Sequence, residues 1–304
     1  MNINISTNGG IIMKFIREKQ YICINGNGYT EIDIFQISDP HARKLSRAKK
    51  ERLTLPAQKR LNEENSRRAL RLILNDNFVP GDFDITLTYQ DKYLPADKRA
   101  AHNDLIRYIR KLRSIYQKHK RVFKYLYVTE FGEQSDRIHH HVIASRSGFN
   151  RDTVEDTWSL GRTNVKSLRL EQDGTFNKLA NYLMKSIGDS EKYARTWNCS
   201  RNVSRPDMRI KDDKISTKQL QSLLVANRND ELKAVAAKLY RINAADILDV
   251  HAGVCDVTGL MYVKMRYIRR KYERSKSKCV RDFRRKQGHS KNETNNSRLK
   301  TCRN

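Results

Sequence analysis

Hydrophobic and polar residues alternate along several short segments of this 304-residue chain and recur at helical spacing along others. Alternation is typical of β-strands with one buried face. It predicts strands over 21–24, 29–35, 84–89, 124–130, 137–143, 164–170 and a hairpin within 248–270. Helical spacing predicts helices over 103–118, 152–158, 176–187, one or two over 218–240, and two over 41–74 interrupted at Pro56. The polar run 25–28 between the first two strands predicts a hairpin turn.

The predicted strand 137–143 contains three consecutive histidines. Because successive side chains of a strand point to opposite faces, His139 and His141 share one face and can bind one cation, while His140 points the other way. Glu130 ends the preceding strand, and a loop of hairpin length brings it beside the pair. Two imidazoles and a carboxylate, with no cysteine nearby, suit Mg²⁺ or Mn²⁺. The alternative is a run of surface histidines that binds nothing.

The predicted helix 176–187 places its apolar residues along one side. Lys178, Tyr182 and Lys185 cluster on the opposite side. A phenol with an unperturbed pKa of about 10 is a weak nucleophile, and nearby cations favour the phenolate and neutralise a phosphate under attack. Tyr182 is therefore a candidate nucleophile. The alternative is a tyrosine that packs at the edge of its helix.

In this order, the three segments resemble the replication-initiator branch of the HUH endonucleases, the rolling-circle initiators of small phages, single-stranded DNA viruses and plasmids. The residues that carry the resemblance are the hydroxyl-rich strand 84–89, the acidic Glu130 upstream of the histidine motif of His139 and His141, and the Tyr-x-x-Lys pair Tyr182 and Lys185. The resemblance covers about residues 80–205, including a segment, 197–206, that looks like a recurrent one in phage-type initiators. Tyr193 lies well beyond one helical turn from Tyr182, so the chain resembles the single-tyrosine type.

This resemblance implies an α+β fold, with a central antiparallel sheet of about five strands, helices packed on one side, and helical and basic extensions. It implies a site-specific, metal-dependent endonuclease and strand transferase that acts on single-stranded DNA to start rolling-circle replication. Tyr182 would form a 5′-phosphotyrosine and release a 3′-hydroxyl for a host polymerase. Lys185 would contact the DNA or the phosphate, and Lys178 and Arg137 would contact DNA.

The charge of the chain agrees with a nucleic-acid partner, because 61 Lys and Arg against 34 Asp and Glu give a net charge of +27. Residues 264–304 hold sixteen Lys or Arg and three Asp or Glu, which predicts a mobile basic tail or an ordinary solvated terminus. The basic segment 41–74 either grips origin DNA or presents a solvated face. We divide the chain into an N-terminal hairpin and basic helical region, 1–75; an HUH core, 76–214; a helical segment with a hairpin that completes the core, 215–270; and a basic tail, 271–304.

Several features are missing from the sequence. It has no GxxxxGK[ST] phosphate loop, which implies that a host helicase unwinds the DNA. Five widely spaced cysteines indicate free thiols, and no apolar run is long enough to span a membrane, so we expect a protein of the bacterial cytoplasm. Nothing sets an oligomeric state. The motifs leave open an HUH transposase or relaxase, and a non-enzymatic nucleic-acid-binding protein in which the histidines are incidental.

Overall fold

Two antiparallel sheets and the helices around them make up the protein, which confirms the α+β class. The computed structural model describes residues 3–5, 11–38, 55–131, 137–185, 197–226, 229–254 and 259–269. Residues 1–269 form one compact unit. The predicted basic tail, 271–304, lies outside the described residues, as does the basic stretch 41–54.

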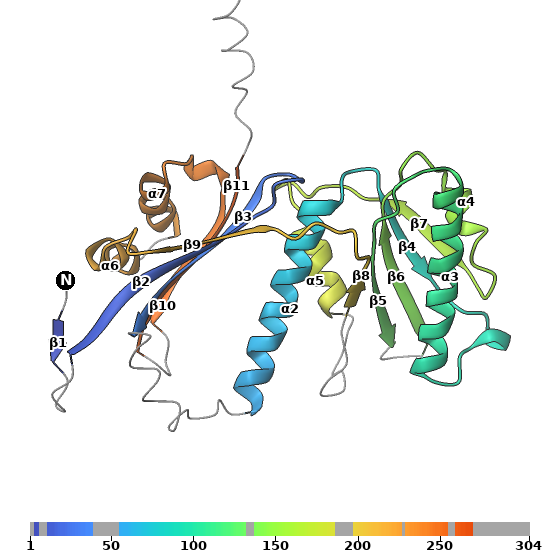
Figure 1. Cartoon of the computed structure of the whole chain (residues 1–304), viewed down its shortest axis with the longest axis horizontal. Coiled ribbons are helices and arrows are strands. Elements are labelled where there is room, and N and C mark those ends of the chain that lie inside the picture. The colour runs from blue at the N-terminus through green and yellow to red at the C-terminus, as the bar shows by residue number, and fades with distance from the viewer. Residues whose placement is uncertain are drawn as a thin grey trace, which may run out of the picture. The chain divides into compact units, whose positions relative to one another are not determined.

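The sheet that carries the histidine motif has five antiparallel strands, as predicted (Figure 1). Their order across the sheet is β7 (Thr163–Ser167), β4 (Phe83–Leu87), β6 (Ile138–Ala144), β5 (Tyr125–Phe131) and β8 (Trp197–Cys199). The histidine strand β6 is therefore central, with β4 and β5 on either side. The short edge strand β8 was not predicted.

Helices cover both faces of this sheet, which corrects the expectation that they pack on one side. On one face lie α3 (Lys98–Lys118) and α4 (Arg151–Glu155); on the other lie α2 (Leu55–Asn77) and α5 (Asn177–Lys185) (Figure 1). The physical reason is that the inner strands are apolar on both sides. In β5, for example, Tyr125 and Tyr127 face α3, whereas Leu126 and Val128 face α5.

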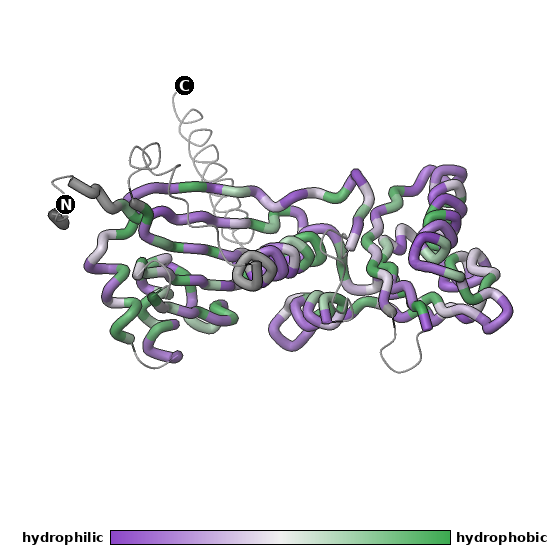
Figure 2. Tube along the Cα trace, turned by 90° about the horizontal axis from the view of Figure 1, so that it is seen from below, coloured by the Kyte–Doolittle hydropathy of each residue, from purple (hydrophilic) through white to green (hydrophobic). Residues whose placement is uncertain are grey.

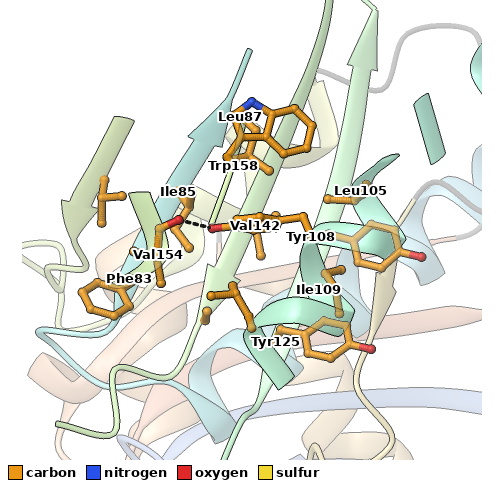
Figure 3. Close-up of a cluster of buried hydrophobic side chains, with 14 of the residues drawn as sticks. Phe83, Ile85, Leu87, Leu105, Tyr108, Ile109, Tyr125, Val142, Val154 and Trp158 are labelled. Atoms are coloured by element: carbon orange, nitrogen blue, oxygen red, sulfur yellow. Dashed lines mark hydrogen bonds between the residues drawn. The ribbon is translucent and has the colours of Figure 1, made fainter. Parts of the chain in front are cut away.

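Helix α3 follows the amphipathic pattern of its sequence. The Asp97 side chain accepts a hydrogen bond of 2.6 Å from the Ala100 amide and caps the first turn. The predicted inward residues are all buried: Leu105, Ile109, Leu112 and Tyr116. They pack on the sheet together with α4, as Figure 3 shows. Full burial of each such aliphatic side chain stabilises the fold by about 1.5–3 kcal/mol. No helix among the residues that the structure describes is long and apolar enough to cross a membrane.

The N-terminal and C-terminal hairpins pair with each other in the other sheet, which has six strands. Its strands are β1 (Ile3–Ile5), β2 (Ile11–Ile22), β3 (Tyr29–Ser38), β11 (Met261–Ile268) and β10 (Ile247–Val254), with β9 (Asp207–Asp212) paired to β2. Both hairpins were predicted, but the second was expected to extend or cover the histidine sheet, and that expectation is wrong.

The alternation within the hairpin strands explains this pairing. Val263 and Met265 lie opposite Ile34 and Ile32 of β3, and all four are buried beneath α6 (Thr217–Val225) and α7 (Asn229–Tyr240). Hydrophobic and hydrophilic residues alternate along these strands in Figure 2. The polar face thus turns away from α6 and α7.

Helix α2 joins the two sheets. Pro56 lies in its first turn, where a missing amide costs nothing, so the helix is continuous from Leu55. Leu70, Ile73 and Leu74 enter the core of the histidine sheet. On another side, Arg68 and Arg71 bind Glu31 of β3, each at 3.0 Å. These two arginines of the basic segment are therefore engaged in ion pairs within the protein rather than presented to DNA.

Candidate active site

The histidine strand is flanked by strands that bring polar side chains to the same face. His141 lies opposite Thr86 of β4 and Val128 of β5, and His139 lies opposite Glu130 of β5. Paired residues of antiparallel strands share a face. Strand alternation therefore gathers Thr86, Glu130, His139 and His141 on one face of the sheet, as the sequence predicted for the two histidines and the glutamate.

His141 is the best-fixed member of this group. Its side chain is 6% exposed, and its Nε2 atom lies 3.0 Å from Glu130 Oε2. Its Nδ1 atom lies 3.5 Å from Thr86 Oγ1, at the outer limit of a hydrogen bond. The imidazole is thus held between a carboxylate and a hydroxyl that come from the two neighbouring strands.

His139 lies beside this pair but is turned differently. Its Nδ1 atom donates to the Arg137 carbonyl oxygen at 2.7 Å, which leaves Nε2 as the ring's second donor or ligand atom. The donor set suits a hard or borderline cation in kind. Among the described residues, however, no group of three His, Cys, Asp or Glu side chains lies close enough together to hold a metal ion. A centre made of Glu130, His139 and His141 stays a prediction, resting on residue types and a shared face.

Helix α5 carries Tyr182 to the same place. Ala180, Leu183 and Met184 are buried against the sheet, and the Glu171 carboxylate accepts hydrogen bonds from the first amides of the helix. The Tyr182 side chain is 54% exposed, on the opposite side of the helix from the buried residues. Its ring stands edge-on to the His141 ring, with centroids 5.5 Å apart and planes at 86°. The structure thus brings the candidate nucleophile and a candidate ligand together.

The electrostatic setting of Tyr182 differs from the prediction. Burial raises the pKa of its phenol, and the charges of Glu130 and Asp84 raise that pKa further. The neighbouring cations Lys178 and Lys185, which were expected to favour the phenolate, are exposed on the helix. In this setting the carboxylates of the sheet outweigh the lysines, and the phenol is held protonated.

Arg137, predicted to contact DNA, forms an ion pair with the exposed Asp91 carboxylate. It precedes the histidine strand, so it lies at the end of β6 nearest His139. Both partners are exposed, which makes the pair weak in water and easily exchanged for a phosphate. A role in binding DNA therefore stays a prediction for Arg137.

Asp84 is a site residue that the sequence reasoning missed. It lies on β4 two residues before Thr86, opposite Ile143 of β6 and Lys166 of β7. Burial raises the pKa of its carboxyl, and the charges of His141 and Lys166 oppose that rise. The signal was present in the alternation of 84–89, because its polar positions at 84, 86 and 88 fall on one face. That strand was interpreted only as a support.

His140 points to the opposite face, as predicted. Its ring is fully buried and lies 2.9 Å from both the Tyr89 hydroxyl and the Thr129 hydroxyl. In a neutral imidazole one ring nitrogen donates and the other accepts, so these two hydroxyls satisfy both nitrogens. Burial lowers the pKa of His140 to about 3.

This buried imidazole gives a testable dependence of stability on pH. Below about 6.5 the unfolded chain binds a proton at His140 that the folded protein refuses, so stability falls as the pH falls from about 6.5 towards 3. Relative to a His140→Asn variant, which does not titrate, the native protein should lose about 1.4 kcal/mol of unfolding free energy per pH unit in this window. Urea unfolding at pH 7.0, 6.0 and 5.0 measures it, as chosen test points of roughly one unit spacing. Parallel pH profiles for the two proteins would contradict it.

Residues 82–189 match a protein family described as Replication-associated protein ORF2/gene II protein. The match spans about a third of the chain and includes the strands β4, β5 and β6 and the helix α5, which carry the candidate site. No curated protein and no solved structure matches the chain significantly. The family match is consistent with a replication initiator and with interaction with DNA.

Proposed function

We propose that this protein is a site-specific, metal-dependent endonuclease and strand transferase that nicks single-stranded DNA to start rolling-circle replication. One observation carries the proposal: Tyr182 on α5 stands 5.5 Å, ring to ring, from His141, whose Nε2 atom contacts Glu130. All three residues lie within the segment that matches the replication-associated family. A solvent-accessible phenol beside an imidazole and a carboxylate suits attack on a phosphodiester.

In the proposed reaction the Tyr182 oxygen forms a bond to the phosphorus of the scissile phosphate. The bond from that phosphorus to the 3′ oxygen breaks, and the 3′ oxygen takes up a proton from water. The tyrosine proton passes to one of the carboxylates whose charge acts on the phenol, Glu130 or Asp84. The products are a 5′-phosphotyrosine on the protein and a free 3′-hydroxyl that a host polymerase extends. A later 3′-hydroxyl reverses the step and reseals the strand, so joining needs no ATP.

Glu130, His139 and His141 would hold the Mg²⁺ or Mn²⁺ ion that the proposed reaction requires. When bound, such an ion acts as a Lewis acid towards the phosphate oxygens and orients them. Without it, the raised pKa of Tyr182 leaves the phenol protonated. The carboxylates that raise this pKa are thus suited to receive the proton once the attack begins.

The partners that we propose are single-stranded and origin DNA, with a host helicase and polymerase in the bacterial cytoplasm. The net charge of +27 supports a polyanionic ligand. Near the site, Lys178 and Lys185 are exposed on α5 on either side of Tyr182 along the helix. Cations so placed neutralise the phosphates on each side of the attacked one.

The test is the covalent intermediate. The protein is incubated with Mn²⁺ and a pool of single-stranded oligonucleotides, then separated on a denaturing gel. A labelled band that survives denaturation and migrates with the protein indicates a covalent link, and peptide mass spectrometry assigns the modified residue. We expect the modification at Tyr182. No adduct with either Mn²⁺ or Mg²⁺ across a pool that covers all short sequences would refute the proposal.

Lys185→Ala should slow formation of the adduct by about tenfold, because one exposed cation contributes about 1.4 kcal/mol at most to a charged transition state. Lys185 ends α5 and is exposed, so its removal leaves the buried side of the helix intact. Single-turnover cleavage at saturating DNA measures the effect. Lys118→Ala, at the last position of α3, is the matched control. An unchanged rate for Lys185→Ala would remove this lysine from the site.

A further inference from the structure

The turn of the N-terminal hairpin, residues 25–28, docks on the C-terminal end of α2. The Asn25 amide donates to Asp76 Oδ1 at 2.9 Å, and the Asn27 amide lies 3.4 Å from the Asn75 carbonyl oxygen. Gly26 fits so closely that a Cβ atom at this position would lie 1.7 Å from that same carbonyl oxygen. The hairpin of one sheet is thus seated on the helix that supports the other.

Asn75 passes this contact on to α5. Its buried side chain uses every hydrogen-bonding capacity that it has. Oδ1 accepts from Asn27 Nδ2 at 2.8 Å and from the Phe176 amide at 3.1 Å. Nδ2 donates to the Arg71 carbonyl oxygen at 2.9 Å and to Asn177 Oδ1 at 3.2 Å. One amide therefore ties together the hairpin turn, α2 and the first residue of α5.

Asn27 makes a second contact on the same path. Besides Asn75, its Nδ2 atom donates to the Gly174 carbonyl oxygen at 2.8 Å. Gly174 has a positive φ of 79° and lies three residues before α5 begins. The amide of Asn27 thus holds the approach to the helix directly, and holds its start through Asn75.

Helix α5 depends on such contacts for its position. It has nine residues, and isolated helices of this length are marginal in water, so tertiary contacts must hold it. Its buried residues fix how deep it sits on the sheet, and the contacts at Phe176 and Asn177 fix where it starts. Tyr182 lies about 7.5 Å along the axis from that start, because each residue advances a helix by about 1.5 Å.

We propose that Asn27 and Asn75 are positioning residues that fix α5, so that the N-terminal hairpin sets the place of the Tyr182 hydroxyl relative to the scissile phosphate. The inference rests on the proposed function for its catalytic consequence. The coupling of hairpin to helix stands on the hydrogen bonds alone. Small displacements of a reacting group matter, since a shift of about 1 Å can cost about 100-fold in rate.

Asn27→Asp is the sharpest test. The carboxylate keeps the oxygen that accepts from the Tyr29 amide within the turn. It loses both donations and sets an oxygen against the oxygens of Asn75 and Gly174. Asn75 cannot turn its amide over to compensate, because its Oδ1 atom also accepts from the Phe176 amide. We expect single-turnover cleavage at saturating DNA to fall by about 10- to 100-fold, while the dissociation constant for DNA changes by less than about twofold.

A readout independent of activity accompanies this. Hydrogen–deuterium exchange of residues 177–185 should accelerate by about tenfold or more in Asn27→Asp, and exchange of α3 should not. Asn25→Ala, in the same turn, is the matched control, since the Asn25 side chain reaches only Asp76, at 3.5 Å. Gly26→Ala, which wedges the turn away from Asn75, should repeat the effect of Asn27→Asp.

Three results would overturn the coupling: unchanged exchange of α5 in both variants, equal acceleration in α5 and α3, or an equal effect from Asn25→Ala. A fall in DNA affinity with an unchanged cleavage rate would overturn the positioning role. If the native protein forms no adduct at all, the proposed function fails, and exchange of α5 still decides whether the hairpin holds the helix.

Discussion

Tyr182→Phe is expected to abolish the covalent protein–DNA adduct. The substitution removes one oxygen atom, the proposed nucleophile, and keeps the ring that packs edge-on against His141 at 5.5 Å. Loss of a nucleophile costs on the order of 10⁴-fold or more in rate. Because the Tyr182 side chain is 54% exposed, its hydroxyl contributes little to folding, and the thermal midpoint should stay within about 2 °C. Single-turnover cleavage of labelled DNA with Mn²⁺, followed on a denaturing gel, measures the loss.

Tyr93→Phe is the matched control, because Tyr93 is 41% exposed and lies in a segment distant in sequence from α5. It should form the adduct at the native rate. DNA binding by Tyr182→Phe should also match the native protein, which separates a lost nucleophile from a lost binding surface. An adduct that persists in Tyr182→Phe would place the nucleophile elsewhere, with Tyr193 the first residue to examine.

The parts of the fold that could be predicted are those that local periodicity determines. Helix α3 was predicted over 103–118 and its four inward residues are buried, because an amphipathic stripe of that length has one way to face a core. The histidine strand was predicted over 137–143 and observed as Ile138–Ala144. In both cases the information lies within one element.

Pairing between distant strands could not be predicted in this way. The alternation in 261–268 fits a strand in either sheet, and only the match of Val263 and Met265 to the buried face of β3 assigns it to the N-terminal hairpin. The strands β8 and β9 have three and six residues and were missed. Their hydrogen bonds come from β5 and β2, which are far away in sequence.

The candidate site divides in the same manner. The shared face of His139 and His141 follows from strand alternation alone, and their proximity to Glu130 follows from a short connection. The predicted direction of the Tyr182 pKa shift was wrong, because lysines that are neighbours in sequence point to solvent on the helix. The carboxylates of Glu130 and Asp84, which raise that pKa, come from two strands that only the tertiary fold brings near.

His139→Ala and His141→Ala should each lower the single-turnover cleavage rate by about 10³-fold, while DNA affinity changes by less than about twofold. The metal's contribution to a phosphoryl transition state is several kcal/mol, and each 1.36 kcal/mol is a factor of ten in rate. Affinity, by contrast, is spread over many phosphate contacts, and neither imidazole supplies one. Cleavage with Mn²⁺ and filter binding of the same oligonucleotide measure the two quantities.

The two variants separate a metal ligand from a structural residue, because the two imidazoles are held differently. His141 is 6% exposed and bound to Glu130, so its removal destabilises the fold as well, whereas His139 contacts a backbone carbonyl and its loss should leave the thermal midpoint nearly unchanged. His251→Ala, an exposed histidine of β10, is the control and should cleave normally. If His139→Ala cleaves at the native rate while His141→Ala fails only through unfolding, then neither imidazole acts as a ligand, and the shared face of the histidine strand is architecture alone.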